Sequence, residues 1–265
     1  MASAQELLAA GDPHAALQAL QQQVREKPSD AKLRVFLFQL LSVLGQWERA
    51  MAQLVVCGEL DPLTLAMVNT YSEAIKCEAV RSAVFAGKTT PVVFGQPTAW
   101  MAMLIEALSQ DGQGQPAQAQ RLRADAFEQA PATAGSLNGE AFDWIADADS
   151  RLGPVLEVVL NGRYTWVPFN ALSAITVEAP EDLRDMVWAP VHLTFGNGGD
   201  SVALVPTCYP GTREQPDGKL KLARATEWLP CGPDQYAGLG QRVLSTSSAE
   251  LGLLEAREIK LTPSS

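Results

Sequence analysis

The dipeptide Asn161-Gly162 constrains the fold more than any other feature of the sequence, because it separates two runs of apolar, β-branched and aromatic residues. Asn-Gly is the pair that best tolerates the positive φ angles of a two-residue type I′ turn. We therefore predict that Val155–Leu160 and Arg163–Val167 form an antiparallel hairpin. Pro168 cannot donate a ladder hydrogen bond, so it ends the second strand or lies on a sheet edge.

The residues after this hairpin favour further strands in a mostly antiparallel sheet. Each expected strand is a short run of β-branched or aromatic residues next to Gly, Pro or charged residues. These runs are Leu172–Val177, Val191–Phe195, Val202–Val205 and Arg257–Leu261. Glu181–Asp185 predicts a charged turn or short helix. The GNGGD stretch at residues 196–200 is typical of a hairpin loop. It fits a phosphate-binding loop less well, because such a loop needs a following helix.

The first half of the chain repeats with a period of 34 residues. The residues that mark the period are Gly11 with Pro28, Gly45 with Pro62 and, in a third unit with the same 17-residue spacing, Gly114 with Pro131. Tetratricopeptide repeats, which are pairs of helices, have this period. Glycine permits the turn between the paired helices, and proline ends the second helix. We predict an N-terminal TPR-like α-helical repeat array.

A stretch of small residues, Pro and Gly at Ala130–Gly139 is typical of a linker between two parts of the chain. After it we expect a helix, capped by Ser136 or Asn138, whose apolar face is Phe142, Ile145 and Leu152. We expect Asp143, Asp147 and Asp149 on the solvated face of this helix, since a calcium loop would need a closing Glu. The predicted fold class is α+β. The TPR-like array occupies residues 1–135, and a smaller, mostly antiparallel β-sheet domain occupies residues 136–265.

Composition narrows the function classes. Twenty Lys and Arg against thirty Asp and Glu give a net charge of −10, and no basic block occurs. We therefore expect neither nucleic acid nor a membrane among the partners. The start of the chain has neither the basic region nor the apolar core of a signal peptide, so we expect no signal peptide. The cysteines lie far apart, which favours reduced thiols and no metal or cofactor; they are Cys57, Cys77, Cys208 and Cys231.

Three sequence words carry a family resemblance: GRYTWVPF at 162–169, PEDLRDMVWAP at 180–190 and LVPTCYPG at 204–211. In this order they resemble the ImpE/TagJ family, accessory proteins of the bacterial type VI secretion system. The resemblance runs from Asn161 to about Arg242. It implies a cytoplasmic, non-enzymatic adaptor that contacts the contractile sheath. The implied partner is a helical segment of the small sheath subunit TssB, with an indirect link to the ClpV ATPase.

We predict that the aromatic and arginine side chains within these words are exposed and bind the partner, because such residues dominate interface hot spots. They are Tyr164, Trp166, Phe169, Arg184, Trp188 and Tyr209. The alternative is that Trp166 and Trp188 belong to the core of the sheet domain. In that case Arg184 ties a loop together with Asp182 and Asp185. The binding groove lies either on the concave face of the repeats or at the seam with the sheet.

Two other functions stay open from the sequence. One is a hydrolase or transferase whose acidic site combines Asp182, Asp185 and His192. His14 and His192 are the only histidines, and neither lies in a nucleophile motif such as GxSxG, so we expect no catalysis. The other is a general peptide-binding TPR scaffold unrelated to secretion.

Overall fold

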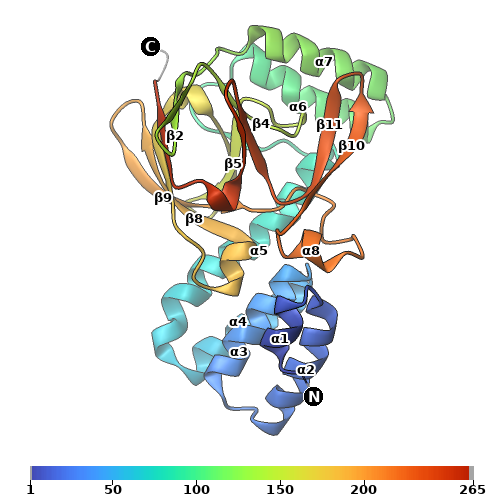
Figure 1. Ribbon diagram of the computed structural model, residues 1–265, viewed down its shortest axis with the longest axis vertical. Helices are drawn as coiled ribbons and strands as arrows, with labels where there is room; N and C mark the ends of the chain where they lie inside the picture. Colours follow the sequence, from blue (N-terminus) through green and yellow to red (C-terminus); the bar gives the residue numbers. More distant parts are fainter. Residues whose placement is uncertain (1, 263–265) are drawn as a thin grey trace.

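The computed structural model describes residues 2–262. Its first half is helical, as predicted. The helices are α1 (Ala4–Ala9), α2 (Pro13–Glu26), α3 (Ala31–Val43), α4 (Trp47–Leu60), η1 (Pro62–Thr64), α5 (Leu65–Phe85), α6 (Ala99–Gly112) and α7 (Pro116–Gln129). Figure 1 shows α1–α4 gathered at one end of the molecule, with α5 running from that group to the sheet. Helices α6 and α7 lie at the opposite end.

The marks of the predicted repeat lie where helix pairs require them. Gly11, Gly45 and Gly114 have φ angles of 86°, 68° and 73° and join α1 to α2, α3 to α4, and α6 to α7. Side chains are rarely tolerated at such angles. The alanine five residues after each glycine is fully buried, which lets paired helices approach closely; these are Ala16, Ala50 and Ala119. The TPR-like arrangement is confirmed.

The second half forms a nine-stranded sheet in the order β1-β6-β5-β9-β8-β7-β14-β2-β3. Its strands are β1 (Val92–Val93), β2 (Gly135–Leu137), β3 (Glu140–Phe142), β5 (Val155–Leu160), β6 (Arg163–Pro168), β7 (Leu172–Val177), β8 (Trp188–Phe195), β9 (Asp200–Pro206) and β14 (Glu258–Leu261). Every pairing is antiparallel except β1 with β6. Asn161 and Gly162 have φ angles of 50° and 72°, and the predicted hairpin pairs Leu160 with Arg163.

Two smaller sheets complete the fold (Figure 1). One contains β10 (Thr226–Gly232) and β11 (Gln235–Gly240). The other has the order β13-β12-β4, with β4 (Ile145–Asp147), β12 (Val243–Thr246) and β13 (Glu250–Gly252). Short helical turns join the strands: η2 (Phe169–Ala171), η3 (Leu183–Met186), α8 (Gly218–Lys221) and η4 (Leu253–Glu255).

The prediction of a helix after the linker is wrong. Residues 135–147 form β2, β3 and β4 instead, and neither Ser136 nor Asn138 caps a helix. Asn138 and Gly139 have φ angles of 51° and 90° and make a tight turn between β2 and β3. This is the same dipeptide that makes the β5–β6 hairpin. Phe142 and Ile145, predicted on a helix face, belong to the core of the sheets instead.

Strand β5 separates two apolar cores, because every residue in it is buried. Val155 and Val159 belong to the core that includes the helices, together with Phe38, Leu41 and Trp188. Leu156, Val158 and Leu160 belong to the core on the other face, as the two-residue alternation of a strand requires. The helical and sheet parts thus share a core. The division of the chain into a domain of residues 1–135 and a domain of residues 136–265 stays a prediction.

Among the described residues, no helix has the length and the apolar composition needed to cross a membrane.

Candidate functional site

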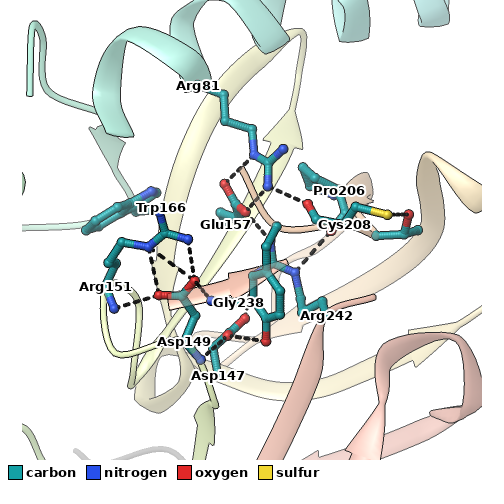
Figure 2. Close-up of polar contacts among 12 residues, drawn as sticks. Arg81, Asp147, Asp149, Arg151, Glu157, Trp166, Pro206, Cys208, Gly238 and Arg242 are labelled. Carbon is teal, nitrogen blue, oxygen red and sulfur yellow. Dashed lines mark hydrogen bonds and ion pairs between the residues drawn. The ribbon is translucent and has the colours of Figure 1, made fainter. Parts of the chain in front are cut away.

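Glu157 is the one charged residue in the run VLEVVL of β5, and its side chain is fully buried on the face of the sheet that meets α5. Burial of an unpaired carboxylate would be very unfavourable. Arg81 of α5 supplies the countercharge: its Nε and Nη2 donate to the two carboxylate oxygens at 2.8 and 2.6 Å (Figure 2). This forked geometry fixes the distance and the rotation of α5 relative to β5.

A second arginine extends the cluster. Arg242, also fully buried, contacts Glu157 with one terminal nitrogen and Asp147 with the other (Figure 2). Its Nε donates to the carbonyl of Pro206 at 3.0 Å. The four charges alternate in sign along Arg81, Glu157, Arg242 and Asp147, and we call this set the buried ion-pair chain. It joins α5, β5, β4 and the segment that leads into β12.

Neighbouring hydroxyl and backbone groups satisfy the remaining hydrogen bonds of the chain. Tyr164 donates to Glu157 at 2.5 Å, and the indole of Trp166 donates to the Tyr164 hydroxyl at 2.8 Å. Tyr209 donates to Asp147 at 2.9 Å. Arg81 also donates to the carbonyl of Cys208 at 2.7 Å. Such saturation is what makes buried charges tolerable.

The two carboxylates of the chain differ in proton affinity. Burial favours the neutral form of Glu157, but Arg81 and Arg242 outweigh it and lower the pKa of Glu157 to about 2. Burial dominates at Asp147 and raises its pKa to about 6, although Arg242 acts in the opposite direction. Glu157 is therefore charged near neutral pH.

The expectation that Asp143, Asp147 and Asp149 lie on a solvated face is wrong for two of them. Asp147 and Asp149 are buried, whereas Asp143 is exposed. Asp149 pairs with Arg151 at 2.5 Å and accepts from the amide of Gly238 at 2.9 Å (Figure 2). Within residues 2–262, no group of three or more His, Cys, Asp or Glu side chains is placed to hold a metal ion.

The surface of the array carries an exposed apolar cluster where α4 turns into α5. Leu60, Leu63 and Leu65 are 39%, 92% and 49% exposed. A side-chain carbon built on Gly58 of α4 would lie 3.4 Å from Leu65, so this leucine rests against the preceding helix. We call these three residues the α4–α5 apolar patch. Exposed leucines gathered in this way are a feature of interaction surfaces.

Comparison with known proteins identifies the family. The chain is 54% identical over 260 residues to the type VI secretion system accessory component TagJ of Pseudomonas aeruginosa, covering 98% of this chain and 91% of that protein. The chain belongs to the ImpE/TagJ family. A family model described as ImpE protein matches residues 139–260, and a tetratricopeptide repeat model matches residues 7–62. The resemblance carried by the three sequence words is therefore confirmed.

The fold is also found in a crystal structure of a protein from Vibrio parahaemolyticus. The two chains superpose with a TM-score of 0.89 over 98% of each chain, at 23% sequence identity. This likeness establishes that the helical array and the antiparallel sheet occur together in another protein.

The ImpE/TagJ words contribute Tyr164, Trp166 and Trp188 to the core shared by the array and the sheet, whereas Phe169 packs in the core on the other face of the sheet. Five of the six residues predicted to be exposed are buried. Tyr164, Trp166, Phe169, Trp188 and Tyr209 are all 3% exposed or less. Trp166 packs against Phe85 of α5 with ring centroids 6.4 Å apart. The expectation of exposure is wrong for these five, because the words encode contacts within the molecule. That leaves Arg184, whose side chain is 25% exposed.

Trp188 shows how a family word binds the array. Its ring lies 5.7 Å from those of Trp47 in α4 and Tyr71 in α5, measured between centroids. Its indole nitrogen donates to Glu78 at 2.9 Å. Arg184, four residues before Trp188 and within η3, stacks over Tyr71 at 5.2 Å. The second word therefore fastens the sheet to α4 and α5.

The acidic site considered as an alternative is not assembled in this ImpE/TagJ chain. Asp185 accepts from the amides of Glu181 and Asp182 at 2.9 and 2.8 Å, which closes the turn at η3. Asp182 pairs with Arg184 at 2.5 Å. His192 lies on β8 and faces Asp200 at 3.3 Å. Asp182 and Asp185 thus bond to each other and to Arg184 within one turn, whereas His192 has a different partner, Asp200.

We predict that Trp188→Ala lowers the free energy of unfolding by about 3–5 kcal/mol, since it removes a fully buried indole and leaves a cavity. Urea unfolding followed by circular dichroism measures this. Trp144, which is 40% exposed, is the matched control, and Trp144→Ala should cost about 1 kcal/mol or less. A Trp188→Ala protein as stable as the wild type would contradict the assignment of this residue to the core.

We predict that Glu157→Gln destabilises the fold by about 3–5 kcal/mol near neutral pH, because it leaves Arg81 and Arg242 without their shared countercharge. The folded pKa of Glu157 lies below the ordinary value of 4.5. The contribution of its charge is therefore complete above pH 4.5 and is lost as the pH falls toward 2. The difference in unfolding free energy between wild type and variant should shrink over that range.

The quantity to measure across pH is the difference in unfolding free energy between wild type and Glu157→Gln. The unfolding free energy of either protein alone also depends on Asp147, whose raised pKa gives a pH dependence of opposite slope. Glu73→Gln is the control, as Glu73 forms an exposed pair with Lys76. It should change the unfolding free energy by about 0.5 kcal/mol or less. A wild type–variant difference that does not depend on pH would refute the assigned role of Glu157.

Proposed function

We propose that this ImpE/TagJ protein is a non-enzymatic adaptor of the type VI secretion apparatus that binds a helical segment of the small sheath subunit TssB. The observation that carries the proposal is the α4–α5 apolar patch on a TPR-like array in a chain of this family. A cytoplasmic location and an indirect link to the ClpV ATPase belong to the same proposal and rest on the family resemblance.

The patch suits an amphipathic helix. Its leucines come from the end of α4, from η1 and from the start of α5, so they form a short apolar surface beside two helices. A partner helix with apolar side chains at positions i, i+3 or i+4 and i+7 can bury them. Covering an exposed leucine fully stabilises a complex by about 1.5–3 kcal/mol, and Leu63 has most to gain, being 92% exposed.

The seam between the array and the sheet is another possible place for the binding groove. A cavity of about 350 Å³ opens there, lined by charged and aromatic residues that include Glu78, Arg81 and Arg151. These charges already have partners inside the molecule. A helix inserted there would have to displace those pairs, which is costly. The patch is therefore the better site for an apolar helix face.

Arg184 completes the proposed contact. Of the six residues predicted from the family words, it has the side chain that solvent still reaches. It stacks on Tyr71 of α5, the helix that begins with Leu65. We propose that a carboxylate at the edge of the bound helix replaces Asp182 in its partly exposed pair with Arg184. The five buried residues act on binding indirectly, by holding α4 and α5 in place.

The test is a titration of the full chain with a fluorescent peptide from the start of the cognate TssB. We expect saturable binding, and about a tenfold or greater loss of affinity for Leu63→Glu with an unchanged melting temperature. Val202→Glu is the matched control, since Val202 is 75% exposed on β9 in the sheet and should leave affinity unchanged.

Absence of binding at high micromolar peptide would overturn the proposed mechanism. A pulldown from cells then distinguishes an adaptor of the secretion apparatus from a general peptide-binding scaffold. Enrichment of sheath proteins supports the adaptor, whereas their absence together with other bound peptides indicates a general peptide-binding scaffold.

A further inference from the structure

Helix α5 covers only part of the sheet face that meets the array. Its last turns contact β5 through Arg81 and β6 through Phe85. The same face continues over β9, β8 and β7, where three residues paired side by side across the strands are all exposed. These residues are Val202, His192 and Thr176. The array therefore leaves this part of the sheet open to solvent.

A cavity of about 380 Å³ lies between α5 and the open part of the sheet. The residues that line it include Glu73, Val159, Glu178, Pro190, Val202 and Leu204. Val159 and Leu204 belong to the core shared with the helices, and Leu204 pairs with Pro190, so these three form an apolar floor on the array side of the sheet. Val202, two residues before Leu204, points the same way and is 75% exposed. We call this site the α5–β9 groove.

The turn between β5 and β6 holds the α5 wall of the groove in place. Gly162 in that turn has a φ angle of 72°, and a side-chain carbon built there would lie 3.5 Å from Cγ of Glu73. Glu73 therefore packs directly on the backbone of the turn. One helical turn further along α5, the thiol of Cys77 donates to the carbonyl of Gly162 at 3.4 Å. The two sides of the groove are thus already in contact, and a ligand binds to a preformed site.

The α5–β9 groove is acidic. Among the described residues, Glu73 and Glu178 line it and no Lys or Arg does. Val177 belongs to the core on the other face, so strand alternation directs Glu178 toward the groove. Within residues 2–262, the exposed carboxylate of Glu178 has no ion-pair or hydrogen-bond partner. Glu73 pairs with Lys76 at 2.6 Å, but such an exposed pair contributes little and a ligand cation can replace it.

A cation beside an apolar group is complementary to this arrangement. His192, which also lines the groove, faces Asp200 at 3.3 Å and so does not offset the two glutamates. The amide of Glu178 donates to the carbonyl of Pro190 at 3.0 Å, and Pro190 pairs with Leu204. Two strand spacings, about 10 Å, therefore separate the apolar floor from the free carboxylate. A Lys or Arg next to an apolar residue spans this distance, with its aliphatic stem over Pro190.

We propose that the α5–β9 groove binds a segment of a partner protein in which a Lys or Arg neighbours an apolar residue. The apolar side chain covers Val202, and the cation pairs with Glu178 and Glu73. A protein segment fits better than a free amine, because the exposed row across β9, β8 and β7 extends the groove along the sheet and a small molecule would leave it uncovered. The site is separate from the α4–α5 apolar patch and does not depend on the function proposed above.

A second copy of this chain is a weaker occupant than a basic segment. Two copies joined through this face would bring the glutamates of both grooves together, and like charges across an interface oppose association. The net charge of −10 on each chain acts in the same direction.

The experiment is to select peptides from a random library displayed on phage, with the full chain as target. We expect enriched sequences that place Lys or Arg within two residues of an apolar residue. Their affinity, measured by fluorescence anisotropy, should fall about tenfold or more for Glu178→Lys. The matched control is Glu140→Lys, which makes the same charge change at an exposed glutamate of the same sheet. Glu140 pairs with Leu137 of the opposite core, so this variant should bind normally.

Charge reversal tests the contact itself. A selected peptide whose Lys or Arg is replaced by Glu should lose affinity for the wild type and regain about tenfold on Glu178→Lys. Leu63→Glu, which changes the α4–α5 apolar patch, should leave the affinity of the selected peptides unchanged. The outcome for this groove is thereby distinguished from the outcome for the TssB site.

Four results would overturn the proposal. One is no enrichment of peptides, and another is equal affinity for Glu178→Lys and Glu140→Lys. The third is displacement of the peptides by micromolar spermidine, which would assign the groove to a free amine. The fourth is a dimer in sedimentation that Val202→Glu dissociates while no peptide binds, which would assign the groove to a second copy.

Discussion

The pairing of Arg81 with Glu157 is the interaction on which the arrangement of the molecule depends. Glu157 lies in a strand that is buried on both faces, and Arg81 is the group that makes its charge tolerable. Buried ion pairs contribute little net stability but penalise every arrangement in which one partner is left alone. The pair therefore selects one position of α5 on the sheet, and apolar packing by Trp166 and Trp188 supplies the free energy.

The same logic explains why the family words contain so many aromatic residues. Tyr164 and Trp166 form a hydrogen-bonded relay to Glu157, while Trp188 contacts α4 and α5 directly. In isolation these words look like a recognition surface, because interfaces between proteins and interfaces within one protein use the same residues. The α4–α5 apolar patch, which we propose as the partner surface, lies outside the words.

The sequence predicted the helix pairs and the central hairpin, since both depend on local marks. The prediction for residues 136–152 is wrong, because the composition around Asn138-Gly139 is typical of a linker although this dipeptide makes the same kind of turn as Asn161-Gly162. The flanking strands there are only three residues long and show too little alternation to identify. Pairing of Asp147 with Arg242 joins residues 95 positions apart, and no local pattern reveals such a contact. Exposure of Leu63 likewise depends on how α4 and α5 pack.

Helix α5 has a mechanical consequence. It begins with Leu65 of the α4–α5 apolar patch and carries Arg81 in its last two turns. At 1.5 Å per residue, about 24 Å of continuous helix connects the two points. If a partner segment binds at the patch as proposed, a force on that segment would be transmitted through one uninterrupted helix to Glu157 of β5.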